Sequence, residues 1–336
     1  MALTAAVLFG ISTPLVQRFG SGVGAFATAA LLYLGAAAAG ALLRQRVERE
    51  ARILSGDFPR LLAMAAAGAV VGPVALAWGL QRTSATSASL MLTLEAVFTA
   101  VLAWRMYRET MDRRVWTAML LLVVGGVLLI LNQGRDDGAG AWGLLAVLLA
   151  TAAWGVDNTL SRSLAERDPG QVVLAKAVLG AAATSMLAIV FGEPLPTLGA
   201  AVGLLAVGAI GYGLSLRFYL LAQRAFGAAR TGSVFAFAPF IGATLAVTLG
   251  DQSVSWLMAV GGALMLAGVV LHLAEAHGHE HEHQLTEHEH AHRHDDGHHD
   301  HVHDPMPITA HSHRHRHDPL RHVHPHVPDA HHAHRH

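Results

Sequence analysis

Histidine is confined to the end of this chain. All 24 His lie at position 272 or later, and from His277 the pattern His-X-His recurs, with Glu, Asp and Arg among the residues between. Residues two apart in an extended chain project to the same side, roughly 7 Å apart, and imidazole with carboxylate suits zinc, nickel, cobalt and copper(II). The predicted metal ligands are His277, His279, His281, His283, His288, His290, His292, His294, His299, His301, His303, His311, His313, His315 and His317.

A second group that could do chemistry consists of polar residues inside otherwise apolar stretches. Glu95, Asp157, Asn158 and Lys176 stand there, and ionisable groups at membrane depth usually face a bundle interior or a watery cavity. We predict that they bind a substrate or a coupling ion, with Glu95 accepting a proton or a cation. Two alternatives stay open: Glu95 caps backbone groups or pairs with an Arg, and Asp157 lies near the cytoplasmic end and is simply solvated.

Lys176 is the only lysine of the chain. It either neutralises Asp157 across the sixth and seventh helices, attracts an anionic group of the substrate, or snorkels to the interface. Arg217 is interpreted as an anchor at the cytoplasmic end. Pro14, Pro73 and Pro239 fall inside apolar stretches, where each either breaks a helix to free carbonyls for a cavity or only kinks it for packing. Pro239 is included among the candidate site residues.

The composition around these residues is that of a membrane protein. Charged residues make up 14% of the chain, against about a quarter in soluble domains, and apolar stretches long enough to cross a bilayer recur. The sequence predicts ten spans at residues 2–17, 22–43, 59–80, 84–104, 115–131, 141–160, 171–191, 198–221, 228–249 and 254–273.

Arginine sorts the connections between these spans. The even-numbered connections carry most of the Arg residues, whereas the odd-numbered ones hold only Arg18, Arg82 and Arg135. Basic connections stay in the cytoplasm, so both termini are predicted to be cytoplasmic. The first apolar run has no basic segment before it, which favours a retained helix over a cleaved signal.

An internal repeat predicts the architecture. LQRTSATSASLMLTLEAVFTAVLAW, from Leu80, matches AQRAFGAARTGSVFAFAPFIGATLAV, from Ala222, and FGISTPL near Phe9 matches WGVDNTL near Trp154. Each copy has five helices, so the second copy must enter the membrane upside down. The predicted fold is an all-α polytopic membrane protein, with ten transmembrane helices arranged as two inverted five-helix repeats.

The segments TSATSASLMLTLEAVFTAVLAWRMYRE (83–109), GG (125–126), APFIGATLA (238–246) and LGD (249–251) resemble the drug/metabolite transporter superfamily, EamA type. The likeness places the first repeat at residues 1–132 and the second at 141–274. It implies a carrier with a central cavity lined by helices one to four and six to nine. The proline that usually follows the Glu of the first copy is Ala96 here, so the likeness leaves a break in the fourth helix undecided.

The tail, residues 275–336, lacks an apolar face and is predicted to be disordered. The sequence has no ATP, dinucleotide or nucleophile motif, so we predict a non-enzyme without nucleic-acid partners or a required cofactor. The leading hypothesis is a secondary transporter in a bacterial cytoplasmic membrane that exports small organic metabolites and has a metal-responsive tail. Alternatives are a divalent metal transporter and a membrane-anchored metal buffer or sensor. Homodimerisation is left open.

Overall fold

The computed structural model describes most of the chain. The described residues are 1–43, 53–107, 111–133, 138–161, 164, 167–226, 228–251, 254–273, 278–282, 286–292, 311–317 and 321–325. The Arg-rich second connection, including Arg44, Arg46, Arg49 and Arg52, lies outside them.

The first repeat consists of helices that fall into five spans. They are α1 (Ala2–Gly10) with α2 (Ser12–Gly20); α3 (Ala25–Leu42); η1 (Ser55–Asp57), α4 (Phe58–Met64), η2 (Ala65–Val71) and α5 (Gly72–Leu80); α6 (Ala85–Met91), η3 (Leu92–Leu94) and α7 (Glu95–Tyr107); and α8 (Arg113–Gln133).

The second repeat has the same five-span plan. Its elements are α9 (Ala139–Ser161); α10 (Pro169–Val190); α11 (Leu198–Val207), η5 (Gly208–Leu214) and α12 (Ser215–Phe226); α13 (Ala228–Phe235) and α14 (Ala238–Thr248); and α15 (Trp256–Leu273).

The prediction of an all-α polytopic membrane body is confirmed. Among the described residues, nine helical stretches are long and apolar enough to cross a membrane, and the shorter Ala238–Thr248 belongs to the remaining predicted span. That ninth span is not one continuous helix, because a turn at residues 236–237 separates α13 from α14.

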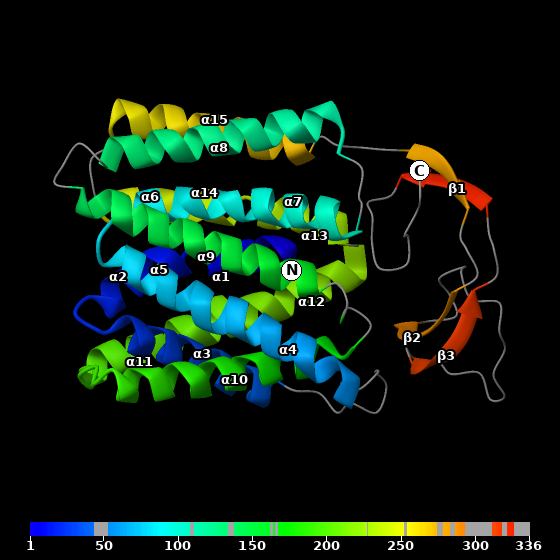
Figure 1. Cartoon of the computed structure of the whole chain (residues 1–336), viewed down its shortest axis with the longest axis horizontal. Coiled ribbons are helices and arrows are strands. Elements are labelled where there is room, and N and C mark those ends of the chain that lie inside the picture. Colours follow the sequence, from blue (N-terminus) through cyan, green and yellow to red (C-terminus); the bar gives the residue numbers. More distant parts are fainter. Residues whose placement is uncertain are drawn as a thin grey trace.

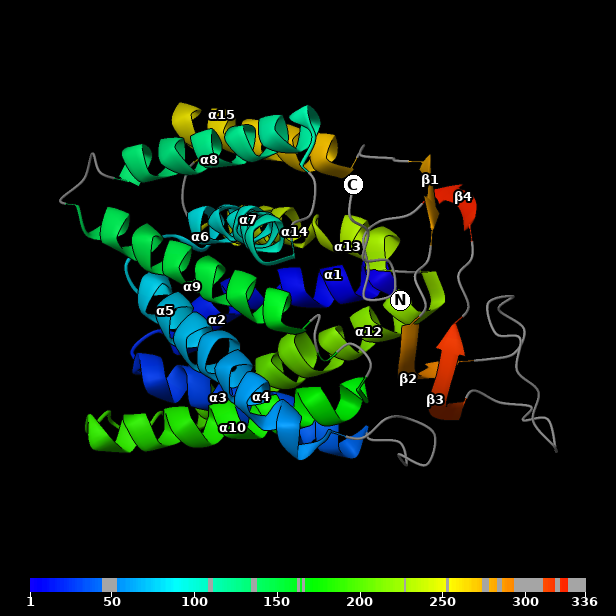
Figure 2. The same ribbon diagram turned by 45° about the vertical axis from the view of Figure 1, so that its right-hand side comes forward.

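The spans run side by side between two ends of the bundle (Figure 1). The near end of the bundle is the end at which α1 begins and α15 finishes. The far end is the opposite one, at which α5 finishes and α6 begins. α1 runs from near to far, whereas its counterpart α9 runs from far to near (Figure 2). The two repeats are therefore inverted relative to each other.

The fourth and ninth spans, which correspond in the two repeats, break at matching places. The fourth changes from α-helix to 3₁₀-helix over Leu92–Leu94, and the ninth has its turn just before Pro239, which lies in the first turn of α14. Proline suits the first turn of a helix because the N–H it lacks has no intrahelical partner there. The fourth span breaks although Ala96 stands where the family has proline.

The third and eighth spans also correspond, and each contains a π-helical segment that the sequence did not predict. The segments are η2 and η5, both seven residues long. A π-turn widens the helix and is frequent at functional sites. Pro73 follows η2 closely and cannot donate a backbone hydrogen bond, whereas η5 contains Gly208, Gly211 and Gly213 instead.

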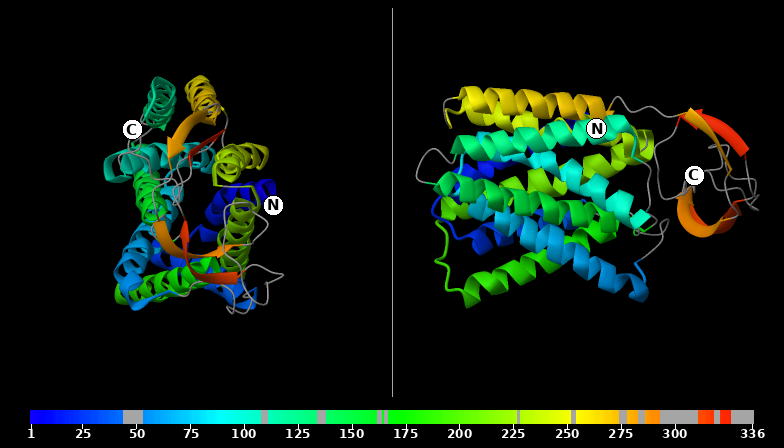
Figure 3. Two further views of the ribbon diagram at one scale, coloured as in Figure 1. Left: turned by 90° about the vertical axis from the view of Figure 1, so that its right-hand side faces the viewer. Right: turned by 45° about the horizontal axis from the view of Figure 1, so that its top comes forward.

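Close contacts between small residues hold the bundle together. A Cβ atom added at Gly35 would overlap the carbonyl oxygen of Leu205, and one added at Gly208 would overlap that of Leu32, so α3 and η5 approach backbone to backbone. α8 and α15 meet in the same way at Gly125 and Gly261 and form a pair at one side of the bundle (Figure 3). Small residues commonly permit such approach between membrane helices.

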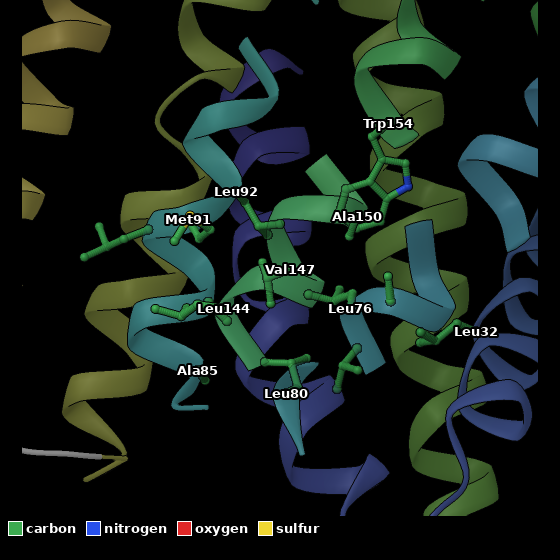
Figure 4. Close-up of a cluster of buried hydrophobic side chains, with 14 of the residues drawn as sticks. Leu32, Leu76, Leu80, Ala85, Met91, Leu92, Leu144, Val147, Ala150 and Trp154 are labelled. Atoms are coloured by element: carbon green, nitrogen blue, oxygen red, sulfur yellow. The ribbon is translucent and has the colours of Figure 1, made fainter. Parts of the chain in front are cut away.

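A buried apolar cluster fills the space between the third, fourth and sixth spans. Leu76, Met91 and Leu144 are almost fully buried in it, and Figure 4 shows these side chains converging from α5, α6 and α9. Trp154 lies at the edge of this cluster, where it adjoins the polar groups described below.

Within the tail, the structure describes four short strands. β1 (Gly278–Glu282) pairs antiparallel with β4 (Arg321–Pro325), and β2 (Thr286–His292) with β3 (His311–His317). The strands lie beyond the near end of the bundle (Figure 1). Residues of opposite charge stand opposite each other in the register, as in Glu287 with Arg316, and such cross-strand pairs stabilise a sheet.

Candidate polar site in the bundle

A buried ion pair joins the sixth and seventh spans. The Lys176 ammonium on α10 donates a hydrogen bond to Oδ2 of Asp157 on α9, and their side chains are 14% and 6% exposed, respectively. The other carboxylate oxygen, Oδ1, is buried and has no hydrogen-bond partner among the described residues. Of the three interpretations of Lys176, neutralisation of Asp157 is therefore the one that the geometry matches.

Glu95 and Asn158 extend this pair toward the fourth span. Nδ2 of Asn158 donates a hydrogen bond of 2.6 Å to Oε1 of Glu95. Glu95 is the first residue of α7, directly after the 3₁₀ break, so the break sets the place of its carboxylate. Asn158 and Asp157 are adjacent on α9, and four of the five predicted site residues therefore form one cluster, which we name the polar cluster (Glu95, Asp157, Asn158 and Lys176).

The π-helical segment of the third span supplies a backbone acceptor next to this cluster. The carbonyl oxygen of Gly68 accepts hydrogen bonds from the Tyr33 hydroxyl at 2.6 Å and from Nε1 of Trp154 at 3.0 Å. A Cβ atom at position 68 would overlap the Asp157 carboxylate. Glycine is therefore required here for the approach of Asp157, and Tyr33 and Trp154 fix the segment that approaches it.

The corresponding place in the first repeat is uncharged. Ser12 stands in FGISTPL where Asp157 stands in WGVDNTL, and a Cβ added at Gly211, in η5, would lie 2.6 Å from the Ser12 Cβ. The rings of Tyr33 and Tyr212, centred 5.9 Å apart, lie between the two places. The fold thus has two pseudo-equivalent positions, and only the one in the second repeat carries an ion pair.

Pro239 lies apart from the polar cluster. It stands in the first turn of α14, where this helix packs against α1: a Cβ added at Gly10 would overlap the carbonyl oxygen of Ala238. Its place matches a role in shaping the ninth span at a close helix contact.

Arg217 lies in the near-end half of the eighth span. Its guanidinium donates a hydrogen bond to the carbonyl oxygen of Leu43, just after α3 ends. This contact agrees with the interpretation of Arg217 as an anchor at a helix end.

The predicted metal ligands divide into those within the strands and those outside the described residues. His277, His283, His294, His299, His301 and His303 lie outside. In the strands, the antiparallel register sets His against His: His279 opposite His324, His281 opposite His322, His288 opposite His315, His290 opposite His313 and His292 opposite His311. Among the side chains that the structure describes, no group of three or more His, Asp or Glu could hold a metal ion.

Sequence reasoning missed Tyr33, Trp154 and Gly68. Trp154 opens the repeated segment WGVDNTL, and Tyr33 is the only polar aromatic residue in an Ala-rich and Leu-rich span, so both carried a signal. Gly68 carried none, because its importance comes from a π-turn that the local sequence AAAGAVV does not specify.

Comparison with known proteins decides the family. The model of the EamA-like transporter family matches residues 1–132 and 141–274, which are the two repeats described above. The chain belongs to the EamA-like transporter family. A relative from Methanothermobacter thermautotrophicus, strain Delta H, described as an uncharacterized transporter, is 27% identical over 237 residues, covering 68% of each chain.

The EamA fold is also found in a solved crystal structure that superposes with a TM-score of 0.58 at 19% sequence identity, over 81% of this chain and 94% of the other. As an EamA-family transporter, the protein is embedded in a lipid bilayer and moves a small molecule. Its polar cluster lies on spans from both repeats, because Glu95 belongs to the first and the other three residues belong to the second.

Proposed function

We propose that the protein is a secondary transporter that exports a small organic solute across a bacterial cytoplasmic membrane. The near end, with the even-numbered connections and both termini, faces the cytoplasm in this proposal. The distribution of Arg among the connections supports that orientation, and the absence of any nucleotide-binding motif from the sequence supports coupling to an ion or substrate gradient.

The observation that carries this proposal is the ion pair of Asp157 and Lys176 together with the hydrogen bond from Asn158, the residue next to Asp157, to Glu95. A buried charge needs a partner or loses stability, so an ammonium group or a proton that reaches Asp157 must compete with Lys176. Oδ1 of Asp157 has no partner among the described residues and offers the point of entry. Glu95 is the second carboxylate of the polar cluster. It lies in the fourth span, directly after the 3₁₀ segment that separates α6 from α7.

The test is uptake into proteoliposomes of a panel of radiolabelled organic solutes, comparing parent protein with Glu95→Gln. We expect Glu95→Gln to lower the coupled rate by at least about tenfold while the folded yield stays within about twofold, because the amide keeps the shape and removes the titratable group. Asp112→Asn is the matched control, since the Asp112 carboxylate accepts a hydrogen bond from the N–H of Val115 in the helix that follows it. A Glu95→Gln rate equal to the parent rate at every pH would contradict the assignment.

The same vesicles distinguish the two other functions. Flux of an organic solute by protein truncated after residue 275 supports the proposal. Flux of zinc, nickel or cobalt instead of organic solutes would replace it with divalent metal transport, and retained metal binding without any flux would leave a membrane-anchored metal buffer or sensor.

We further propose that the tail binds divalent metal ions and regulates transport. The register that sets His against His on alternate positions supports it, because residues directly opposite in an antiparallel pair lie on the same face, about 4.5–5.5 Å apart. With His neutral the tail is acidic and is attracted to the Arg-rich connections, and bound metal cancels that attraction. Deleting the tail should therefore abolish any effect of zinc on the transport rate, whereas an equal zinc response in both proteins would leave the tail a passive chelator.

The paired strands predict that zinc affinity depends on the charged residues opposite each other. This can be tested without changing any His. Glu287 and Glu289 stand opposite Arg316 and Arg314. Glu287→Arg/Glu289→Arg places like charges opposite each other, which destabilises the pairing, and should weaken zinc binding by about three- to tenfold. Adding Arg314→Glu/Arg316→Glu restores the complementarity and should restore the affinity.

The measurement is zinc titration calorimetry on the full-length protein at pH 7.5. A repeat at pH 5.5 should show weaker binding, because imidazole must lose its proton to ligate and its ordinary pKa is about 6.5. Equal affinity for all three charge patterns would show that unpaired His residues bind the metal, and the paired arrangement would then be wrong.

A further inference from the structure

Gln17 ties the first span to the start of the fourth at the far end. Its Nε2 donates hydrogen bonds to the carbonyl oxygens of Leu80, at 3.0 Å, and Thr83, at 2.8 Å, and its Oε1 accepts one from the N–H of Ala85 at 3.2 Å. The side-chain amide of Gln17 thus donates through its nitrogen and accepts through its oxygen. It holds the end of α2 against the connection between the third and fourth spans.

Asp251 adds a bond between the repeats at the same place. It lies in the connection from α14 to α15, and its Oδ2 accepts hydrogen bonds from the N–H of Thr86 at 2.9 Å and from the Thr86 hydroxyl at 3.1 Å. Gln133, at the far end of α8, donates a third bond, to Ser87 Oγ at 3.2 Å. The first turn of α6 is therefore held by hydrogen bonds from three separate parts of the chain.

Several residues near these contacts are buried. Thr13 and Val16, in the far half of the first span, are 2% and 1% exposed, and Thr86 is 2% exposed. In the near half of the same span, Leu3 and Val7 are 65% and 37% exposed, whereas Ala5 and Ala6 are fully buried. The spans around α6 are closed together at the far end.

We infer that Gln17, Thr86 and Asp251, which we name the far-end lock, form the gate that must release for solute to leave at the far end. The inference deepens the proposed function and rests on it. An inverted-repeat carrier alternates by moving one repeat against the other, and the Asp251–Thr86 bond joins the two repeats across that boundary. A solute that leaves at the far end therefore requires the two repeats to separate at the Asp251–Thr86 bond.

The fourth span links this lock to the polar cluster. Thr86 stands at the start of α6 and Glu95 at the start of α7, with the 3₁₀ segment Leu92–Leu94 between them. A 3₁₀ segment inside a helix often marks a hinge. Loss of charge or a bound solute at Glu95 would bend α6 at this hinge and pull its first turn away from Asp251, which makes Asp251 a positioning residue for the transport step.

The absence of cysteine from the sequence allows the lock to be tested without any flux measurement. Ser89 is fully buried within α6, close below the lock, so Ser89→Cys should react slowly with a membrane-impermeant maleimide added at the far side. Adding Asp251→Ala should speed labelling by about tenfold or more, because charge-assisted hydrogen bonds are lost. Ser255→Ala is the control, since Ser255 bonds Asn132 at the same end without touching α6. Equal labelling rates for Ser89→Cys and Ser89→Cys/Asp251→Ala would contradict the inference of a lock.

A reversible cross-link tests whether the lock opens during transport. Thr86→Cys/Asp251→Cys joined by a short bifunctional thiol reagent should lose transport and regain it on reduction, while each single Cys variant should transport at the same rate before and after the same treatment. Transport that continues at the parent rate with the link in place would overturn the inference. If no solute is transported even by the parent protein, the proposed function fails, whereas the labelling result still decides whether the lock exists.

Discussion

Gly208→Leu is expected to yield no folded bundle. Even a single Cβ at this position overlaps the carbonyl oxygen of Leu32, and backbone cannot rotate aside as the end of a flexible side chain can. Forcing a larger residue into a packed contact commonly costs 1–3 kcal/mol, and a clash of two backbones should cost about 3 kcal/mol or more. The measurement is the yield of monodisperse protein in detergent and its thermal unfolding.

Gly199→Leu is the matched control for this substitution. Gly199 lies in α11 of the same span, and a Cβ added there meets nothing within 4 Å. Both variants add the same side chain to the same apolar span, so a difference between them reports the contact alone. Comparable unfolding temperatures for the two variants would show that α3 and η5 do not pack backbone to backbone as described.

Asp157→Asn is expected to destabilise the protein by about 3–5 kcal/mol, because it leaves the Lys176 ammonium buried without its counter-charge. Replacing both partners, as Asp157→Asn/Lys176→Met, should recover most of that loss, since a neutral pair of similar volume is often as stable as the ion pair. Transport should not recover in the double variant. Chemical unfolding in detergent and solute flux in vesicles measure the two effects separately.

This separation decides between a structural and a functional pair. A double variant that is stable and inactive assigns the charges to transport. A double variant that regains both stability and flux would show that the pair only holds α9 to α10. A double variant as unstable as Asp157→Asn would show that Lys176 is not the group left uncompensated.

Much of the fold could be predicted from the sequence because membrane spans carry strong, simple signals. Apolar length predicted the spans, and the copies of FGISTPL and WGVDNTL predicted the inversion. The rarity of charge in the bilayer singled out Glu95, Asp157 and Lys176, and the predicted pairing of the last two agrees with the geometry. Pro239 also stood out, but it lies at a packing contact between α14 and α1.

The interruptions of the helices could not be predicted in the same way. The fourth span breaks without a proline, and the π-helical segments η2 (AAAGAVV) and η5 (GAIGYGL) contain no proline either. Such features depend on what packs alongside: the carbonyl oxygen of Gly68 is accessible to Tyr33 and Trp154 only because those residues arrive from other spans. In the tail, the register of β2 with β3 places opposite charges 25 or more residues apart along the chain beside each other, as in Glu289 and Arg314.

The contacts between the repeats also affect how the chain is made. The first N–H groups of α3 are capped by Glu193, at Phe26 and Ala27, from 167 and 166 residues further along the chain. Asp251, in the connection between α14 and α15, accepts the N–H of Thr86 in the same way. Because ribosomes deliver the N-terminal half first, the N–H groups of Phe26, Ala27 and Thr86 lack these carboxylate acceptors until the second half is inserted. During synthesis the first repeat therefore lacks contacts that it has in the finished protein. The second repeat, made later and inserted with the opposite orientation, supplies them.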